Sequence, residues 1–292
     1  MPTLTESIDE LLLAPTLSIF STPPSPNQSA TYPFEAEYNA ALWGGGAADF
    51  IAEGGGLTGI GWYCSLSLYG RPTPITTQHI ITTQHGRCQV GDTLAWILED
   101  GTIVERTVID ERNHICGRGW EDDFWIGFLD EELPAEIPIA SLLEPDLYSA
   151  TAFNMEGKPL IWVNGNNQNR LLVGDAHLSG DKCYVQYSTS ALRQPYWEAV
   201  EAGDSGSPVY AVLGDTFIYM TNLTQGGGTS GSGPLAVSRM TEIEDAVDSL
   251  NTAQSTTHEL TLVTPDEFEE VPDEALDDPF DRSISLGLGL NF

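Results

Sequence analysis

Basic side chains are scarce in this sequence of 292 residues, which has 11 Lys and Arg against 43 Asp and Glu. The formal net charge of -32 disfavours binding to nucleic acid or to anionic membranes, because both carry negative charge. Solubility is the simplest explanation of this acidity, and selection of basic partners is a second interpretation.

Long apolar runs are also missing, and none reaches the length of about 18 residues that a membrane-spanning helix needs. The N-terminus has no basic segment followed by an apolar core, so no secretion signal is visible. We therefore expect synthesis in a cytoplasm, with incorporation into a virion or release by lysis as routes left open.

Cysteine is rare, with four in the chain: Cys64, Cys88, Cys116 and Cys183. Their connectivity cannot be read from the sequence; a bridge between Cys64 and Cys88 is conceivable, and free buried thiols are the expectation. No spacing of Cys and His matches a zinc site. We expect neither a metal nor a cofactor.

Residues 203–208, with the sequence GDSGSP, are the most informative motif. A serine hydroxyl is a poor nucleophile until a base removes its proton and fixed donors stabilise the oxyanion. Glycines on both sides of Ser205 permit a tight turn, although an ordinary turn is the alternative interpretation. The motif resembles the nucleophile loop of the chymotrypsin-like serine peptidases. That resemblance implies Ser205 as nucleophile and the amides of Gly203 and Ser205 as the oxyanion hole.

Two histidines compete for the role of general base, because Ile-Thr-Thr-Gln-His occurs twice between residues 75 and 85. The family places its base shortly after an apolar strand. A strand, a turn and a second strand between residues 73 and 82 put His85 in that place and His79 at the turn. We predict His85 as the base, with His79 as the alternative.

The acid of a triad should lie between the histidine and the serine. Residues 120–129 (WEDDFWIGFL) resemble the family segment in which an aspartate precedes a buried strand and orients the histidine through its Nδ1–H. Asp123 directly precedes the apolar run and is the predicted acid; Asp122 and Glu121 are alternatives. The resulting order, His then Asp then Ser, is that of chymotrypsin and not of subtilisin or the α/β-hydrolases.

Many short apolar segments broken by Gly, Asn and Asp predict an all-β fold. Residues 93–98 and 102–109 flank an Asp-Gly turn and predict a hairpin. Residues 240–250 place apolar side chains on one face of a helix. The resemblance implies two six-stranded antiparallel β-barrels with this C-terminal helix packed against the second. Other strands are predicted at residues 160–163, 171–173, 183–187, 208–212 and 217–223.

The resemblance covers residues 57–251, the predicted peptidase domain. Residues 1–56, rich in Pro, Ser, Gly and Ala, predict an irregular N-terminal extension. Residues 252–292 predict an acidic tether followed by a β-tail at residues 283–292, which could form an assembly contact. No basic residue precedes Arg71, so activation by cleavage at a basic site is not expected. The chain is most similar to the bacterial and phage members that lack secretion signals.

The resemblance places the base of the specificity pocket near Ala199 and Val200, and the opposite wall at residues 221–228, including Thr221 and Gly226. A trypsin-like pocket has an aspartate at the position of Ala199. Strict cleavage after Arg or Lys is therefore not expected, although a shift of one residue would bring in an acidic neighbour.

The sequence thus predicts a serine endopeptidase that acts on protein or peptide substrates. The alternative is a catalytically silent or anchored structural protein on the same fold, such as a virion or assembly component. The terminal extensions support the alternative, whereas the presence of all three triad residue types favours the enzyme.

Overall fold

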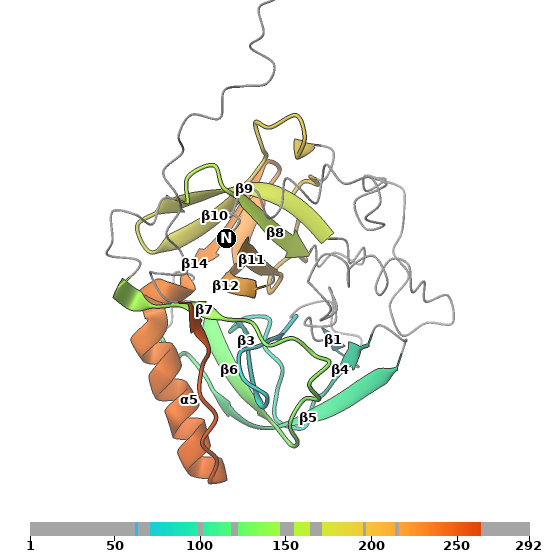
Figure 1. The fold of residues 1–292 in the computed structure, drawn as a ribbon, viewed down its shortest axis with the longest axis vertical. Coiled ribbons are helices and arrows are strands. Elements are labelled where there is room, and N and C mark those ends of the chain that lie inside the picture. The colour runs from blue at the N-terminus through green and yellow to red at the C-terminus, as the bar shows by residue number, and fades with distance from the viewer. Residues whose placement is uncertain are drawn as a thin grey trace, which may run out of the picture.

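The computed structural model describes residues 62–63, 71–98, 102–117, 122–146, 155–163, 171–194, 197–213 and 216–263. The described part is mostly β, with two curled half-barrel sheets and the helix α5 (Met240–Gln254) (Figure 1). The predicted N-terminal extension, the β-tail and the Asp-Gly turn lie outside the described residues.

The first sheet has the strand order β1-β4-β5-β6-β3-β2, and every neighbouring pair is antiparallel. Side chains of β6 alternate between two core clusters, because successive residues of a strand point to opposite faces. The strands are β1 (Trp62–Tyr63), β2 (Thr73–Pro74), β3 (His79–Thr83), β4 (Thr93–Ile97), β5 (Ile103–Arg112) and β6 (Phe124–Leu129).

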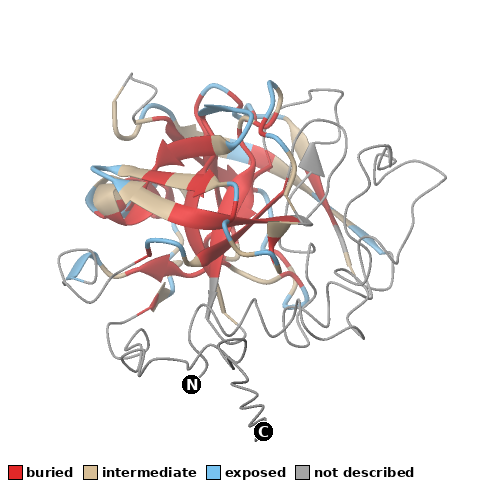
Figure 2. Ribbon diagram, turned by 90° about the horizontal axis from the view of Figure 1, so that it is seen from above, coloured by how far each residue is buried: buried red, intermediate tan, exposed pale blue. Residues whose placement is uncertain are grey.

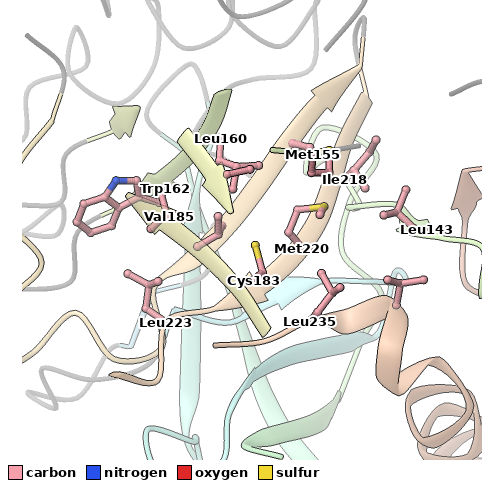
Figure 3. Close-up of a cluster of buried hydrophobic side chains, with 14 of the residues drawn as sticks. Leu143, Met155, Leu160, Trp162, Cys183, Val185, Ile218, Met220, Leu223 and Leu235 are labelled. Carbon is pink, nitrogen blue, oxygen red and sulfur yellow. The ribbon is translucent and has the colours of Figure 1, made fainter. Parts of the chain in front are cut away.

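The second sheet has the order β12-β11-β8-β9-β10-β14-β13. Figure 3 shows its apolar core, in which Trp162, Val185 and Met220 come from three different strands. Along most of these strands buried residues run through the interior, and exposed residues lie mainly in the connections and in the edge strand β13 (Figure 2). The strands are β8 (Pro159–Val163), β9 (Leu171–Ser179), β10 (Lys182–Gln186), β11 (Pro208–Leu213), β12 (Thr216–Asn222), β13 (Gln225–Gly227) and β14 (Ser230–Pro234).

The expectation of two closed six-stranded barrels was wrong in detail. The first sheet reaches six strands only with the two-residue β1, and the second has seven. The extra strand arises because residues 225–234 fold back on themselves as the hairpin β13–β14, with Gly228 at φ +64°. Among the described residues neither sheet closes. The edge strand β2 is short, and its Pro74 has no N–H with which to extend a ladder.

The strands themselves fall close to their predicted positions. The predicted hairpin is the antiparallel pair β4–β5, and the other five predicted segments correspond to β8, β9, β10, β12 and the strand after the GDSGSP motif, β11. Alternating and β-branched segments identify strands well because their side chains fit a pleated, half-buried surface.

The predicted helix is confirmed, but its packing differs from the expectation. Ile243, Val247 and Leu250 are buried, as the periodicity indicates. The helix contacts β5 and β6 of the first sheet and lies along that sheet in Figure 1, so it does not pack against the second sheet alone. Its apolar face joins a cluster that includes Phe124 from β6 and Tyr219 from β12, so it seals the core where the two sheets meet.

The chain after α5 returns to the body of the protein. Ser255 caps the helix in the left-handed region at φ +59°, and β15 (Leu262–Val263) then pairs in parallel with β7 (Leu142–Leu143). The first residues of the predicted acidic tether, 252–263, are therefore part of the folded structure. The rest of the tether lies outside the described residues.

Cys88, Cys116 and Cys183 are free thiols. Burial raises the pKa of Cys116 and of Cys183 to about 12, so both stay protonated at neutral pH. Cys64 lies outside the described residues.

Within the part of the chain that the structure describes, no helix is long and apolar enough to cross a membrane.

Candidate active site

The pairing of β3 with β6 brings the predicted base and acid together. Thr83, the last residue of β3, lies opposite Phe124, the first residue of β6. The ladder continues one step beyond the strands, because the Gln84 N–H donates to the carbonyl of Asp123 at 3.1 Å. His85 and Asp123 therefore meet at the end of a buried strand pair.

Both carboxylate oxygens of Asp123 are engaged by His85. Oδ1 accepts the His85 backbone N–H at 3.0 Å, and Oδ2 is hydrogen-bonded to His85 Nδ1. Asp123 is buried, whereas 28% of the His85 side chain is exposed. Because an ionised carboxylate can only accept, it favours the proton on Nδ1 and leaves Nε2 with its lone pair, which is the form that a general base requires.

The competing residues have other partners. Asp122 lies one residue before Asp123 but forms an ion pair with Arg239 at 2.9 Å. His79 is fully buried at the start of β3, where its Nδ1 is hydrogen-bonded to Thr76 Oγ1 at 2.8 Å and its ring meets the edge of Phe128. Burial lowers the pKa of His79 to about 4. Glu121 lies outside the described residues.

The GDSGSP loop has the backbone conformation that its glycines permit. Gly203 and Gly206 adopt φ +108° and +84°, a region that L side chains rarely occupy. Between them, buried Asp204 stabilises the loop from within: its Oδ2 accepts the Glu201 N–H at 2.7 Å, and its carbonyl accepts the Ser207 N–H at 3.0 Å. Ser205 is half-buried at the tip of the turn.

The two amides predicted to form the oxyanion hole have no acceptor inside the described protein. The neighbouring backbone N–H groups already have acceptors within the protein. The Asp204 N–H donates to the carbonyl of Glu201 at 3.1 Å, and the Gly206 N–H donates to the carbonyl of Leu223 at 2.8 Å. Within the described ranges, no hydrogen bond is formed by the N–H of Gly203 or of Ser205. Both groups can therefore donate to a bound molecule.

The serine loop and the histidine strand are linked through Asn222, the last residue of β12. Its side-chain amide donates to the carbonyl of Gly206 at 2.7 Å and to Thr82 Oγ1 on β3 at 3.2 Å. In Figure 1 β12 lies next to β3, where the two sheets meet. Among the described residues no hydrogen bond joins Ser205 Oγ to His85 itself. Such bonds are often long in a free enzyme and shorten when substrate binds.

The four predicted pocket residues lie in different surroundings. Val200 and Gly226 are neighbours: a Cβ on Gly226 would lie 2.8 Å from Val200 Cγ1, and Val200 exchanges two backbone hydrogen bonds with Gly228. Ala199 is exposed beside them. Thr221 is fully buried, with its hydroxyl donating to the carbonyl of Asn222 at 3.1 Å. The exposed members are thus Ala199 and Gly226.

Sequence reasoning missed Asn222 and its neighbour Tyr219, whose hydroxyl donates to Asn222 Oδ1. In the sequence Asn222 begins an Asn-Leu-Thr sequon, a pattern that points to glycosylation at the surface. The structure instead buries it completely. An asparagine at the end of a predicted strand was the one available signal.

No group of three or more His, Cys, Asp or Glu side chains suited to a metal ion occurs among the residues that the structure describes.

Comparison with models of known protein families gave no match, and comparison with curated protein sequences gave none either. Functional inference therefore depends on the geometry of the site.

Proposed function

We propose that the protein is a serine endopeptidase in which Ser205 is the nucleophile, His85 the general base and Asp123 the residue that orients His85. The observation that carries the proposal is that both carboxylate oxygens of Asp123 are hydrogen-bonded to His85. This arrangement defines the tautomer of the histidine. It is combined with a glycine-flanked serine whose adjacent amides are available as donors.

The proposed reaction begins when His85 Nε2 removes the proton from Ser205 Oγ, which attacks the scissile carbonyl. The developing oxyanion accepts hydrogen bonds from the N–H groups of Gly203 and Ser205. His85 then donates the proton to the leaving amine, and an acyl-enzyme remains. A water molecule activated by His85 attacks the ester, and the proton returns to Ser205 as the acid product leaves. Throughout, the Asp123 carboxylate stabilises the imidazolium.

The architecture is in keeping with a member of the chymotrypsin-like family from its bacterial or phage branch. The catalytic residues occur in the order His85, Asp123, Ser205, and two curled sheets contribute to the site. In that family a buried N-terminal amine holds the aspartate of the serine loop. Here Asp204 accepts the Glu201 N–H, so no new terminus is required for this contact.

We also propose that the primary specificity is not strictly for basic side chains. Ala199, at the expected position of the acidic pocket residue, is exposed; the side chain of neighbouring Val200 is apolar, and Gly226 and Gly231 beside it carry no side chain. A small or apolar side chain before the scissile bond fits this surface better than Arg or Lys does.

Labelling with a fluorophosphonate followed by intact mass spectrometry tests the proposal. We expect one covalent adduct on the wild type and none on Ser205→Ala. His85→Gln should abolish labelling, while His79→Gln should retain it, since His79 lies outside the site. Asp123→Asn should slow labelling by about 10⁴-fold because the wrong tautomer is favoured. The matched variant Asp122→Asn loses only the ion pair with Arg239 and should label at nearly the wild-type rate.

A folded wild type that forms no adduct would contradict the proposal. A catalytically silent protein on the same fold would then be favoured, and the absence of a hydrogen bond between Ser205 and His85 in the described structure agrees with that candidate. Labelling at a residue other than Ser205 would also contradict the assignment. Light scattering at several protein concentrations tests the anchored form of the enzyme, since assembly through residues 283–292 should depend on concentration.

A further inference from the structure

One buried side chain, Asn222, forms hydrogen bonds to the serine loop, to β3 and to Tyr219 in its own strand, β12. Nδ2 donates to the carbonyl of Gly206, the residue after Ser205, at 2.7 Å. It also donates to Thr82 Oγ1, three residues before His85, at 3.2 Å. Oδ1 accepts the hydroxyl proton of Tyr219. Because the Gly206 carbonyl can only accept, the orientation of the Asn222 amide follows from these contacts.

The third contact, with Tyr219, is linked through the ring of Phe124 to the segment that carries the proposed acid, Asp123. The ring of Tyr219 lies 6.4 Å from that of Phe124, centre to centre, and Phe124 directly follows Asp123. Burial raises the pKa of Tyr219 well above its ordinary value, so the phenol stays protonated and is available as the donor to Asn222. A single amide thus bonds directly to the segments that carry Ser205 and His85, and it is connected only indirectly, through Tyr219 and Phe124, to the segment that carries Asp123.

Backbone hydrogen bonds on the same side of the loop support this placement. Gly206 N–H donates to the carbonyl of Leu223 at 2.8 Å, and Leu223 N–H donates to the carbonyl of Ser207 at 2.9 Å. The segment that follows Ser205 is therefore attached to residues 222–223 at three points. The first of these, from Asn222, is the one that also reaches the first sheet.

We propose that Asn222 is a positioning residue that sets the distance between Ser205 and the His85–Asp123 pair across the junction of the two sheets. This inference rests on the proposed function, because a positioning role requires an active serine. The serine loop belongs to the second sheet, whereas the histidine and aspartate lie at the end of β3–β6. The Gly206 carbonyl also accepts the Arg71 N–H, but at 3.4 Å, so loss of the amide would remove the shorter of its two hydrogen bonds and the link from this carbonyl through Asn222 to Thr82.

The test compares second-order labelling rates with a fluorophosphonate and the kcat and KM values for a peptide substrate. Asn222→Leu removes all three hydrogen bonds with little change in volume. We expect labelling to slow by about a hundredfold, the size that a displacement of about 1 Å in a reacting group produces. For the peptide the loss should fall on kcat and leave KM nearly unchanged, because the Asn222 side chain is fully buried beneath the wall at residues 221–228 and its hydrogen bonds lead to the serine loop and to β3.

Asn251→Leu is the matched control. Asn251 is a second buried asparagine, with bonds to His258 and Thr256 in the C-terminal segment and none to the serine loop. It should lose comparable stability and keep the wild-type labelling rate. Thr82→Val, which removes only the 3.2 Å contact, should slow labelling by about tenfold. If Asn222→Leu fails to fold, the labelling rate of Thr82→Val still tests the positioning role.

The outcomes separate the two proposals. If the wild type labels and both Asn222→Leu and Thr82→Val label as fast as Asn251→Leu, the positioning role is overturned and the enzyme assignment stands. A folded wild type that does not label overturns the proposed function and the positioning role together.

Discussion

At the scale of single residues, identical local sequence leads to opposite environments. His79 and His85 both end the pentapeptide Ile-Thr-Thr-Gln-His, yet His79 is fully buried and His85 is partly exposed. His79 begins a strand covered by α5 and the segment after it, so its ring faces Phe128 and His258. His85 lies beyond the end of the same strand, where it meets a carboxylate.

Burial of His79 makes stability depend on pH. The pKa is lowered from 6.5 to about 4, by burial first and by the charge of His258 second. Above pH 6.5 neither the folded nor the unfolded state protonates this residue. Between about pH 6.5 and 4 only the unfolded state does, so stability falls as the pH falls. We expect a loss of about 3 kcal/mol across this range from His79 alone.

Urea unfolding at pH 7, 5.5 and 4.5 measures this effect, with His79→Gln as the comparison. Other groups also titrate in this range, so the decisive quantity is the difference between the two proteins. The wild type should lose more unfolding free energy than the variant on acidification. Parallel pH profiles would show that protonation of His79 is not linked to folding.

At the scale of elements, close approach of backbones decides which residues are tolerated. In β14 a Cβ on Gly233 would lie 1.8 Å from the carbonyl oxygen of Asn222 and 2.5 Å from Thr221 Oγ1. The backbone of β12 cannot move away without displacing Asn222. On the neighbouring edge strand β13, a Cβ on Gly227 would have no atom within 4 Å.

We therefore expect Gly233→Ala to destabilise the protein by about 3 kcal/mol, at the upper end of the range for overpacked sites. Gly227→Ala, in the same hairpin, should change stability by less than about 0.5 kcal/mol, as surface substitutions usually do. Thermal unfolding of the two variants beside the wild type measures the contrast. Equal stability of all three proteins would contradict the close contact between β14 and β12.

At the scale of the whole molecule, the dominant quantity is the net charge of -32. Strong like charge opposes a compact state through self-repulsion. The few cations form local ion pairs. Arg239 pairs with Asp122 and with Asp181, and Asp181 lies in the turn between β9 and β10. Arg193 pairs with buried Asp175. These pairs leave most of the negative charge uncompensated.

Salt should consequently stabilise the protein. Raising NaCl from 0.01 to 0.15 M shortens the Debye length from about 30 Å to about 8 Å. We expect the Tm to rise by roughly 2 to 4 °C, which corresponds to about 1 kcal/mol for a domain of this size. The rise should shrink near the isoelectric point of about 4.1, where net repulsion vanishes. A Tm that falls with salt at neutral pH would mean that ion pairs outweigh repulsion.

Much of the secondary structure could be predicted, because it depends on local patterns. The hairpin β4–β5, the strand after the serine motif and the apolar face of α5 each follow from periodicity and turn chemistry within about 20 residues. The order and spacing of His85, Asp123 and Ser205 likewise pointed to one candidate site. The strands β13 and β14 of the second sheet were not located because a run of Gly and Ser has little strand propensity of its own.

The features of the candidate site that could not be predicted from the sequence depend on contacts between segments far apart in the chain. In the sequence Asp123 was preferred over its neighbour Asp122 only because it directly precedes the apolar run. In the structure the two differ because Arg239 pairs with Asp122, while the β3–β6 ladder aligns Asp123 with His85. The role of Asn222 could not be seen either, since it depends on Thr82, 140 residues away in the chain. Residue types and their order are written in the sequence, but which polar groups meet is set by the packing of the two sheets. Burial then makes every unmatched polar group costly and so selects one arrangement.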